Sequence, residues 1–127
     1  MLIAIDNWQL RIDNYGKFDR KKSFEFAVRI VKLCQYLQKN KNEYILSKQI
    51  MRSGTSIGAN VTESQQAQSR ADFVSKLSIA LKESEETAYW LRLLYATDYI
   101  SKKMYLSIYE DNHELSKILV SIIKSSK

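Results

Sequence analysis

The sequence predicts an all-α protein, an up-down-up-down four-helix bundle that is oligomeric. The chain has no proline and only three glycines in 127 residues, so it lacks the breaks that a sandwich or barrel requires. Apolar residues recur every three or four positions over long stretches, which is the period of an amphipathic helix. Short polar segments separate these stretches, and short connections make consecutive helices antiparallel. At this length we expect one domain.

The first predicted helix spans residues 23–39 and follows an N-terminal arm, residues 1–18, which Gly16 separates from the bundle at 19–127. Ser23 is the expected N-cap. Apolar residues cover an arc of roughly 220° on this helix, whereas a monomer's surface helix needs about 100°. We therefore expect a homo-oligomer in which part of this helix contacts another subunit. The residues assigned to that interface are Phe26, Ile30, Leu33, Leu37 and, on the third helix, Trp90.

The second predicted helix spans residues 43–68, after a turn in which Asn40 and Glu43 have the spacing of a capping pair. Its middle, Arg52–Asn60, contains two glycines, each costing about 1 kcal/mol in a helix interior. Small residues there let a neighbouring helix approach closely. The packing positions are Ser53, Gly54, Ile57, Gly58 and Asn60. An alternative is an internal polar layer made by Ser53, Ser56, Asn60, Ser64 and Asp111.

The third predicted helix spans residues 70–96, and the fourth spans residues 101–124. Ser69 precedes Asp72 by three residues, the spacing of a capping box, so it is the expected N-cap of the third helix. Trp90 lies off the apolar stripe of that helix. Because aromatic residues are enriched in protein contacts, it is a candidate interface anchor.

No residue pattern predicts catalysis, and we expect no enzyme, no cofactor and no metal site. Glu110 and His113 have the spacing used in di-iron bundles, but such a site needs two of these motifs and the chain has one histidine. Glu83, Glu85 and Glu86 are more typical of a salt-bridged surface than of an acid and base pair. The single cysteine, Cys34, falls on the apolar arc of the first helix as a small hydrophobic residue.

The net charge is +6, and residues 1–42 hold nine Lys and Arg against four Asp and Glu. This distribution suggests contact with nucleic-acid phosphates, and an ordinary solvated surface is the alternative. The candidate phosphate-binding residues are Lys22, Arg29, Lys32, Lys48 and Arg52. One cysteine and the absence of a signal sequence or membrane span indicate a cytoplasmic protein.

Several blocks of the sequence resemble the bacterial four-helix bundle family encoded in intervening sequences of 23S ribosomal RNA genes. They are Arg52–Asn60, Ala71–Phe73, Lys76–Glu83 and Tyr89–Leu94. The resemblance runs from about Lys22 to the C-terminus, with Val61 and Ser64 as mild departures. It implies a homopentamer with no established enzymatic activity. The family is also similar to the accessory protein of diversity-generating retroelements, a basic pentameric bundle that works with nucleic acid.

Two functions remain in view. In the first, a homo-oligomeric bundle binds RNA or DNA through basic strips repeated in every subunit. In the second, the bundle is a protein–protein interaction scaffold that works without nucleic acid, with the partner docked on the Trp90 side or on the N-terminal arm. Salt dependence separates them, because phosphate contacts weaken as salt rises.

Overall fold

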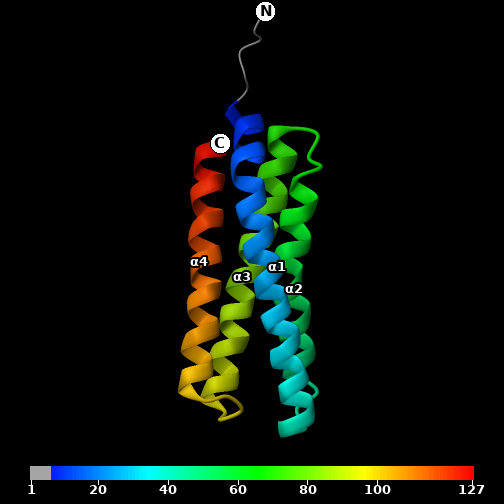
Figure 1. Cartoon of the computed structure of the whole chain (residues 1–127), viewed down its shortest axis with the longest axis vertical. Coiled ribbons are helices and arrows are strands. Elements are labelled where there is room, and N and C mark those ends of the chain that lie inside the picture. Colours follow the sequence, from blue (N-terminus) through cyan, green and yellow to red (C-terminus); the bar gives the residue numbers. More distant parts are fainter. Residues whose placement is uncertain (1–6) are drawn as a thin grey trace, which may run out of the picture.

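A computed structural model describes the backbone of residues 7–127 and the side chains of residues 20–127. Four helices pack side by side in antiparallel order, so the start of α1 and the end of α4 lie at the same end (Figure 1). Between residues 7 and 127 there is no strand. The predicted all-α four-helix bundle is therefore confirmed. The helices are α1 (Asn7–Lys41), α2 (Leu46–Ser64), α3 (Arg70–Ala96) and α4 (Lys102–Ser126).

The start of α1 differs from the prediction. The helix begins at Asn7 and includes Gly16, so the expected boundary at Ser23 and the arm over residues 7–18 are wrong. One glycine costs about 1 kcal/mol, which a long helix tolerates when no proline follows. Ser23 is a buried mid-helix residue whose hydroxyl donates to the Arg20 carbonyl. Residues 1–6 and the side chains before residue 20, including the arm's predicted apolar contacts, lie outside the described residues.

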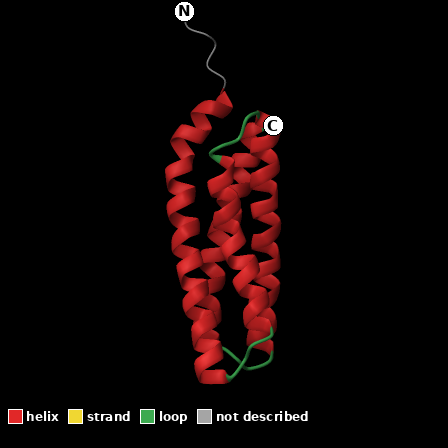
Figure 2. Ribbon diagram, turned by 90° about the vertical axis from the view of Figure 1, so that its right-hand side faces the viewer, coloured by secondary structure: helices red, strands yellow, loops and turns green. Residues whose placement is uncertain are grey.

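The turn between α1 and α2 is capped by one carboxylate. Asn42 takes a left-handed conformation with φ of 51°, which asparagine tolerates, and so ends α1. The buried Glu43 side chain then accepts hydrogen bonds from the backbone N–H groups of Ile45, Leu46 and Ser47. The shortest of these, 2.7 Å, comes from Ser47. Asn40 lies within α1, so the predicted pairing of Asn40 with Glu43 is wrong. Figure 2 shows this turn at the same end as the α3–α4 turn.

The starts of α3 and α4 follow the expected capping chemistry. Ser69 accepts a hydrogen bond from the Asp72 N–H at 3.1 Å, and α3 spans residues 70–96 as predicted. Ser101 accepts from the Met104 N–H at 3.2 Å. The second helix ends four residues earlier than predicted, at Ser64, because tighter backbone bonds over residues 62–67 close its last turn.

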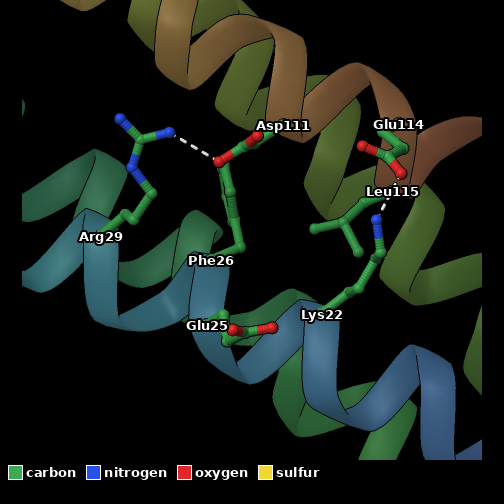
Figure 3. A pocket seen from close by; sticks show the side chains of 7 residues that line it. All are labelled: Lys22, Glu25, Phe26, Arg29, Asp111, Glu114 and Leu115. Carbon is green, nitrogen blue, oxygen red and sulfur yellow. Dashed lines mark hydrogen bonds and ion pairs between the residues drawn. The ribbon is translucent and has the colours of Figure 1, made fainter.

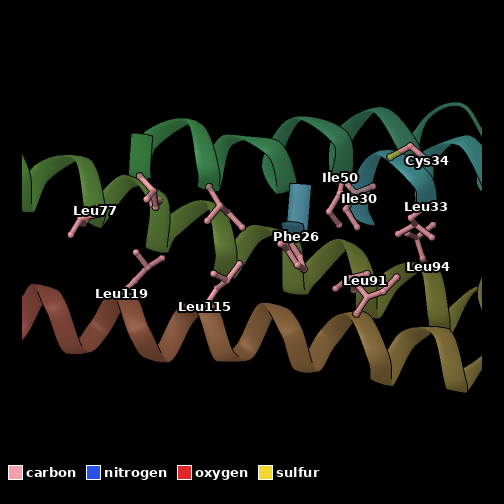
Figure 4. Packing of buried hydrophobic residues seen from close by; sticks show 14 of the residues in the cluster. Phe26, Ile30, Leu33, Cys34, Ile50, Leu77, Leu91, Leu94, Leu115 and Leu119 are labelled. Carbon is pink, nitrogen blue, oxygen red and sulfur yellow. The ribbon is translucent and has the colours of Figure 1, made fainter. Parts of the chain in front are cut away.

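The core is a column of apolar side chains contributed by all four helices (Figure 4). Ile30 and Leu37 from α1, Ile50 and Ile57 from α2, and Leu91 from α3 are fully buried. Burying each such side chain contributes about 1.5–3 kcal/mol. The helices are therefore held mainly by apolar packing along their length.

The glycines of α2 lie against α1. A Cβ atom added at Gly54 would come within 2.7 Å of Cγ1 of Ile30, well inside van der Waals contact. At Gly58 the nearest atom would be the Ser23 carbonyl oxygen, at 3.2 Å. Close approach of α1 to α2 thus requires a residue without a side chain at Gly54.

Polar side chains do form hydrogen bonds between helices inside the bundle, but most of them are not the residues predicted for the internal polar layer. Ser53 accepts a hydrogen bond from the Thr87 hydroxyl at 2.9 Å. Ser84 and Asn112 exchange two more, at 2.9 and 3.0 Å. The other predicted members do not join this layer: Ser56, Asn60 and Ser64 bond to carbonyls of their own helix, and Asp111 pairs with Arg29.

Candidate functional site

The five predicted phosphate-binding residues lie on two separate surfaces. Lys22, Arg29 and Lys32 follow the seam between α1 and α4. Arg52 lies on α2 and reaches α3, while Lys48 is exposed near the start of α2. The structure therefore does not join them into one strip.

The α1–α4 seam contains a hollow of about 320 Å³ with charged walls and an apolar floor made by Phe26 and Leu115. Arg29 donates to Asp111 Oδ2 at 2.6 Å and to the Ser107 hydroxyl at 2.9 Å. At the other side of the hollow Lys22 forms an ion pair with Glu114. Figure 3 shows both pairs crossing from α1 to α4. Two of the three predicted cations of this seam, Lys22 and Arg29, are thus matched by carboxylates, which lowers its attraction for phosphate.

A second ion-pair cluster joins α2 to α3. Arg52 contacts Glu83 at 3.2 Å and also pairs with Glu86, which accepts a hydrogen bond from the Trp90 indole at 3.0 Å. The expected salt-bridged surface exists here, with Arg52 as the partner of these two glutamates. Trp90 is half-buried and its indole is bonded to this cluster, and its role as an interface anchor stays a prediction.

The four residues of α1 that were assigned to the oligomer interface lie inside the bundle and not on its surface. Phe26, Ile30, Leu33 and Leu37 are between 0 and 4% exposed, so a second subunit cannot contact them. The prediction that they form the interface is wrong, because they point at the centre of their own bundle. Helix α1 does carry more apolar surface than its bundle covers, but the surplus is made by other residues.

The surplus apolar surface of α1 faces outward, beside α2. Phe24 is 68% exposed and Val28 is 38% exposed, and both lie one turn apart on the same side of the helix. Next to them is a groove of about 420 Å³ whose α2 wall is made of small residues, among them Thr55, Gly58 and Ala59. We call Phe24, Val28 and this wall the outer α1–α2 face. A helical wheel drawn from Phe24 could have found it, because Phe24 and Val28 lie opposite Phe26 and Leu37.

The single histidine, His113, and the single cysteine, Cys34, lie on different helices and differ in burial. His113 is exposed and stacks on Tyr109, with ring centroids 6.3 Å apart. Cys34 is buried, and its thiol donates to the Ser47 carbonyl at 3.2 Å. Burial, with a smaller contribution from the Glu43 carboxylate, raises the pKa of the Cys34 thiol to about 11. At neutral pH the thiol is protonated and unsuited to nucleophilic attack.

The residues that the structure describes form no group of three or more His, Cys, Asp or Glu side chains placed to hold a metal ion. In the same part of the chain, none of the helices combines the length and apolar character that crossing a bilayer requires.

The fold and these surfaces define a four-helix bundle protein whose charged residues pair between helices. The chain belongs to the family described as 23S rRNA-intervening sequence protein, which matches residues 20–121. The family resemblance inferred from the sequence is thereby confirmed.

A solved structure from Bacteroides thetaiotaomicron, described as a protein with unknown function from the S23 ribosomal protein family, is similar to this chain. The two share 57% sequence identity and superpose with a TM-score of 0.85, over 86% of this chain and 97% of the other. Among curated proteins, none matches the chain.

Proposed function

We propose that the chain is a non-enzymatic helical bundle that assembles with copies of itself through the outer α1–α2 face. The observation that carries this proposal is the 68% exposed Phe24 ring beside a groove of small residues. An exposed aromatic ring and a neighbouring apolar groove of the same chain are the parts that a self-association contact needs. Five subunits are the expected number, as the family resemblance implies.

The proposal also accounts for the residue types on this face. Outside the core, α1 places Phe24, Ala27, Val28 and Val31 on one side, where a solvated helix would carry charged residues. A second copy that covers them removes apolar surface from water at about 25 cal/mol per Å². The gain repeats at each contact if the subunits close into a ring.

Sedimentation at micromolar concentration tests self-association. We expect a species of roughly five times the 14.8 kDa chain mass for the wild type and a smaller one for Phe24→Gln. Tyr89→Gln is the matched control, since Tyr89 on α3 is 54% exposed and lies away from this face. A wild-type chain that sediments only as a monomer contradicts the proposal.

The second candidate function is the binding of RNA or DNA by this bundle. It is favoured by exposed lysines that form no ion pair with a described carboxylate, Lys32 and Lys48 among them. In an assembly each such cation is repeated in every subunit, so weak phosphate contacts become multivalent. The interaction scaffold that works without nucleic acid has no comparable support, because its proposed anchor Trp90 is engaged by Glu86.

A salt titration tests nucleic-acid binding. Affinity for a labelled oligonucleotide should fall steeply between about 50 and 200 mM salt if phosphate contacts carry it. Binding that is indifferent to salt excludes this mode and favours a protein partner, which a pull-down with and without nuclease then identifies.

A further inference from the structure

We propose that one end of the bundle, where the α1–α2 and α3–α4 turns meet, binds single-stranded nucleic acid. We call this region the loop end and define it as residues 39–48 and 92–106 (Figures 1 and 2). The inference rests on the proposed nucleic-acid function and gives it a site. It does not depend on self-association.

The loop end collects cations that are exposed and lack an ion pair with any described carboxylate. They come from all four helices and lie at or near the two turns. They are Lys39, Lys41, Lys48, Arg92, Lys102 and Lys103. By contrast Lys22, Arg29 and Arg52 on the sides of the bundle each pair with a carboxylate. The other six described cations without such a pair are spread over the rest of the bundle, so half of the available positive charge lies at the loop end; those six are Lys21, Lys32, Lys82, Lys117, Lys124 and Lys127.

Acidic groups do little to offset this charge. The loop end contains two carboxylates, Glu43 and Asp98. Glu43 is 7% exposed, and its oxygens accept backbone N–H groups at the start of α2. Asp98 is exposed in the α3–α4 turn. A surface with this excess of cations over anions attracts a polyanion.

Aromatic side chains lie among these cations. Tyr44 is 51% exposed in the turn between Lys41 and Lys48. Tyr95 is 36% exposed, one turn after Arg92, and its ring is held by stacking on Tyr105 with centroids 4.8 Å apart. Cations interleaved with exposed rings are the combination by which proteins bind unpaired bases and their phosphates.

The same features favour a single strand over a duplex or a lipid surface. An exposed tyrosine ring stacks only on a base that is not already paired within a helix. For a lipid surface the loop end offers little apolar area, since Ile45, at 76%, and Leu106, at 50%, are its strongly exposed aliphatic residues. Stable membrane attachment needs a larger buried apolar area in addition to basic residues.

The first experiment compares two triple variants for binding of labelled polyuridylate of about 20 nucleotides. Lys41→Gln, Lys102→Gln and Lys103→Gln together remove charge at the loop end. The matched control replaces Lys117, Lys124 and Lys127 by Gln, three exposed lysines from the other half of α4 and its end. We expect affinity to fall at least about tenfold in the first variant, with the logarithmic salt slope smaller by about 2, and to change little in the control. Helix content and sedimentation are measured for both.

The second experiment tests stacking at Tyr44. Tyr44→Leu should weaken polyuridylate binding about tenfold, whereas Tyr44→Phe, which keeps the ring, should bind like the wild type. If Leu and Phe variants bind alike, stacking at this ring is excluded and the single-strand assignment is overturned.

The outcomes separate the site from the function. If both triple variants lose polyuridylate binding equally, or neither does, the loop end is not the site, while nucleic-acid binding by the bundle stands. If the wild type does not bind polyuridylate at low salt, the nucleic-acid function and its site both fail. If the loop-end variant instead loses sedimentation with vesicles of phosphatidylcholine and phosphatidylserine, with polyuridylate binding unchanged, the partner is a lipid surface and the proposal is overturned.

Discussion

On its inner face α1 buries Ile30 and Leu37 completely, whereas on its outer face Phe24 remains 68% exposed. Both faces are apolar, and they lie on nearly opposite sides of the helix. The inner face meets Gly54 of α2, whereas on the outer face Phe24 lies at the edge of the groove shared with α2 and stays largely uncovered. Residue type therefore indicates how much apolar surface a helix carries, while the neighbouring helices decide which part of that surface is covered.

The largest expected effect comes from truncating a buried side chain on the inner face of α1, and an exposed side chain on the outer face serves for comparison. Ile30→Ala should lower the free energy of unfolding by about 2–5 kcal/mol, because it leaves a cavity in a fully packed core. Val28→Ala on the outer face should cost less than about 1 kcal/mol in a dilute monomer. Urea unfolding at several protein concentrations measures both. A cost for Val28→Ala that grows with concentration would place it in a subunit contact.

A smaller effect is expected from closing the space between α1 and α2. Gly54→Ala should lower the free energy of unfolding by about 1–3 kcal/mol, since the new Cβ would be 2.7 Å from the Ile30 side chain. At Gly58 the nearest atom is 3.2 Å away, and the better helix propensity of alanine offsets much of the strain. Thermal unfolding of the two variants compares them. Equal loss at both positions would contradict the close contact at Gly54.

The burial of Cys34 on the inner face predicts that the free energy of unfolding depends on pH. The pKa of the Cys34 thiol is raised to about 11 in the folded chain from an ordinary value of 9.0, so at pH between these values the unfolded thiol ionises more readily. The unfolded state then binds fewer protons, and stability falls as pH rises through this range, by an amount on the order of 2 kcal/mol. Unfolding measured from pH 8 to about 11 should show this fall, and Cys34→Ala should remove that part of it.

The smallest effect is expected at the edge of α1, between its two faces. Arg29→Gln breaks the ion pair with Asp111, and exposed pairs contribute only about 0–1 kcal/mol. The free energy of unfolding should therefore change little, and the change should shrink further in high salt. A loss comparable to that of Ile30→Ala would show that the α1–α4 seam depends on charge more than on packing.

Much of the fold could be predicted from the sequence because it depends on local patterns. The period of the apolar residues predicted four helices, and Ser69 predicted the start of α3. The inward stripe of α2, with Ile50 and Ile57, follows from the same period. The start of α1 was not predictable in this way, since a single glycine does not end a helix that has no proline.

The candidate surfaces could be predicted only in part. The sequence identified Arg29 and Arg52 as cations but not their partners Asp111 and Glu83, which come from other helices. It also indicated excess apolar surface on α1 without showing that Phe24 is part of it. Pairing between helices depends on how they are rotated about their axes, and the periodicity of one helix does not fix that rotation against another.

The order of the helices has a consequence for how the chain folds. Each helix packs on the one that follows it, so most contacts join residues close in the sequence, a topology associated with folding in microseconds to milliseconds. The seam bridged by Arg29 and Asp111 is different, because it joins the first helix to the last. Because bringing the first and last helices together closes the longest loop, this contact costs the most chain entropy. We therefore expect it to form last and to open first.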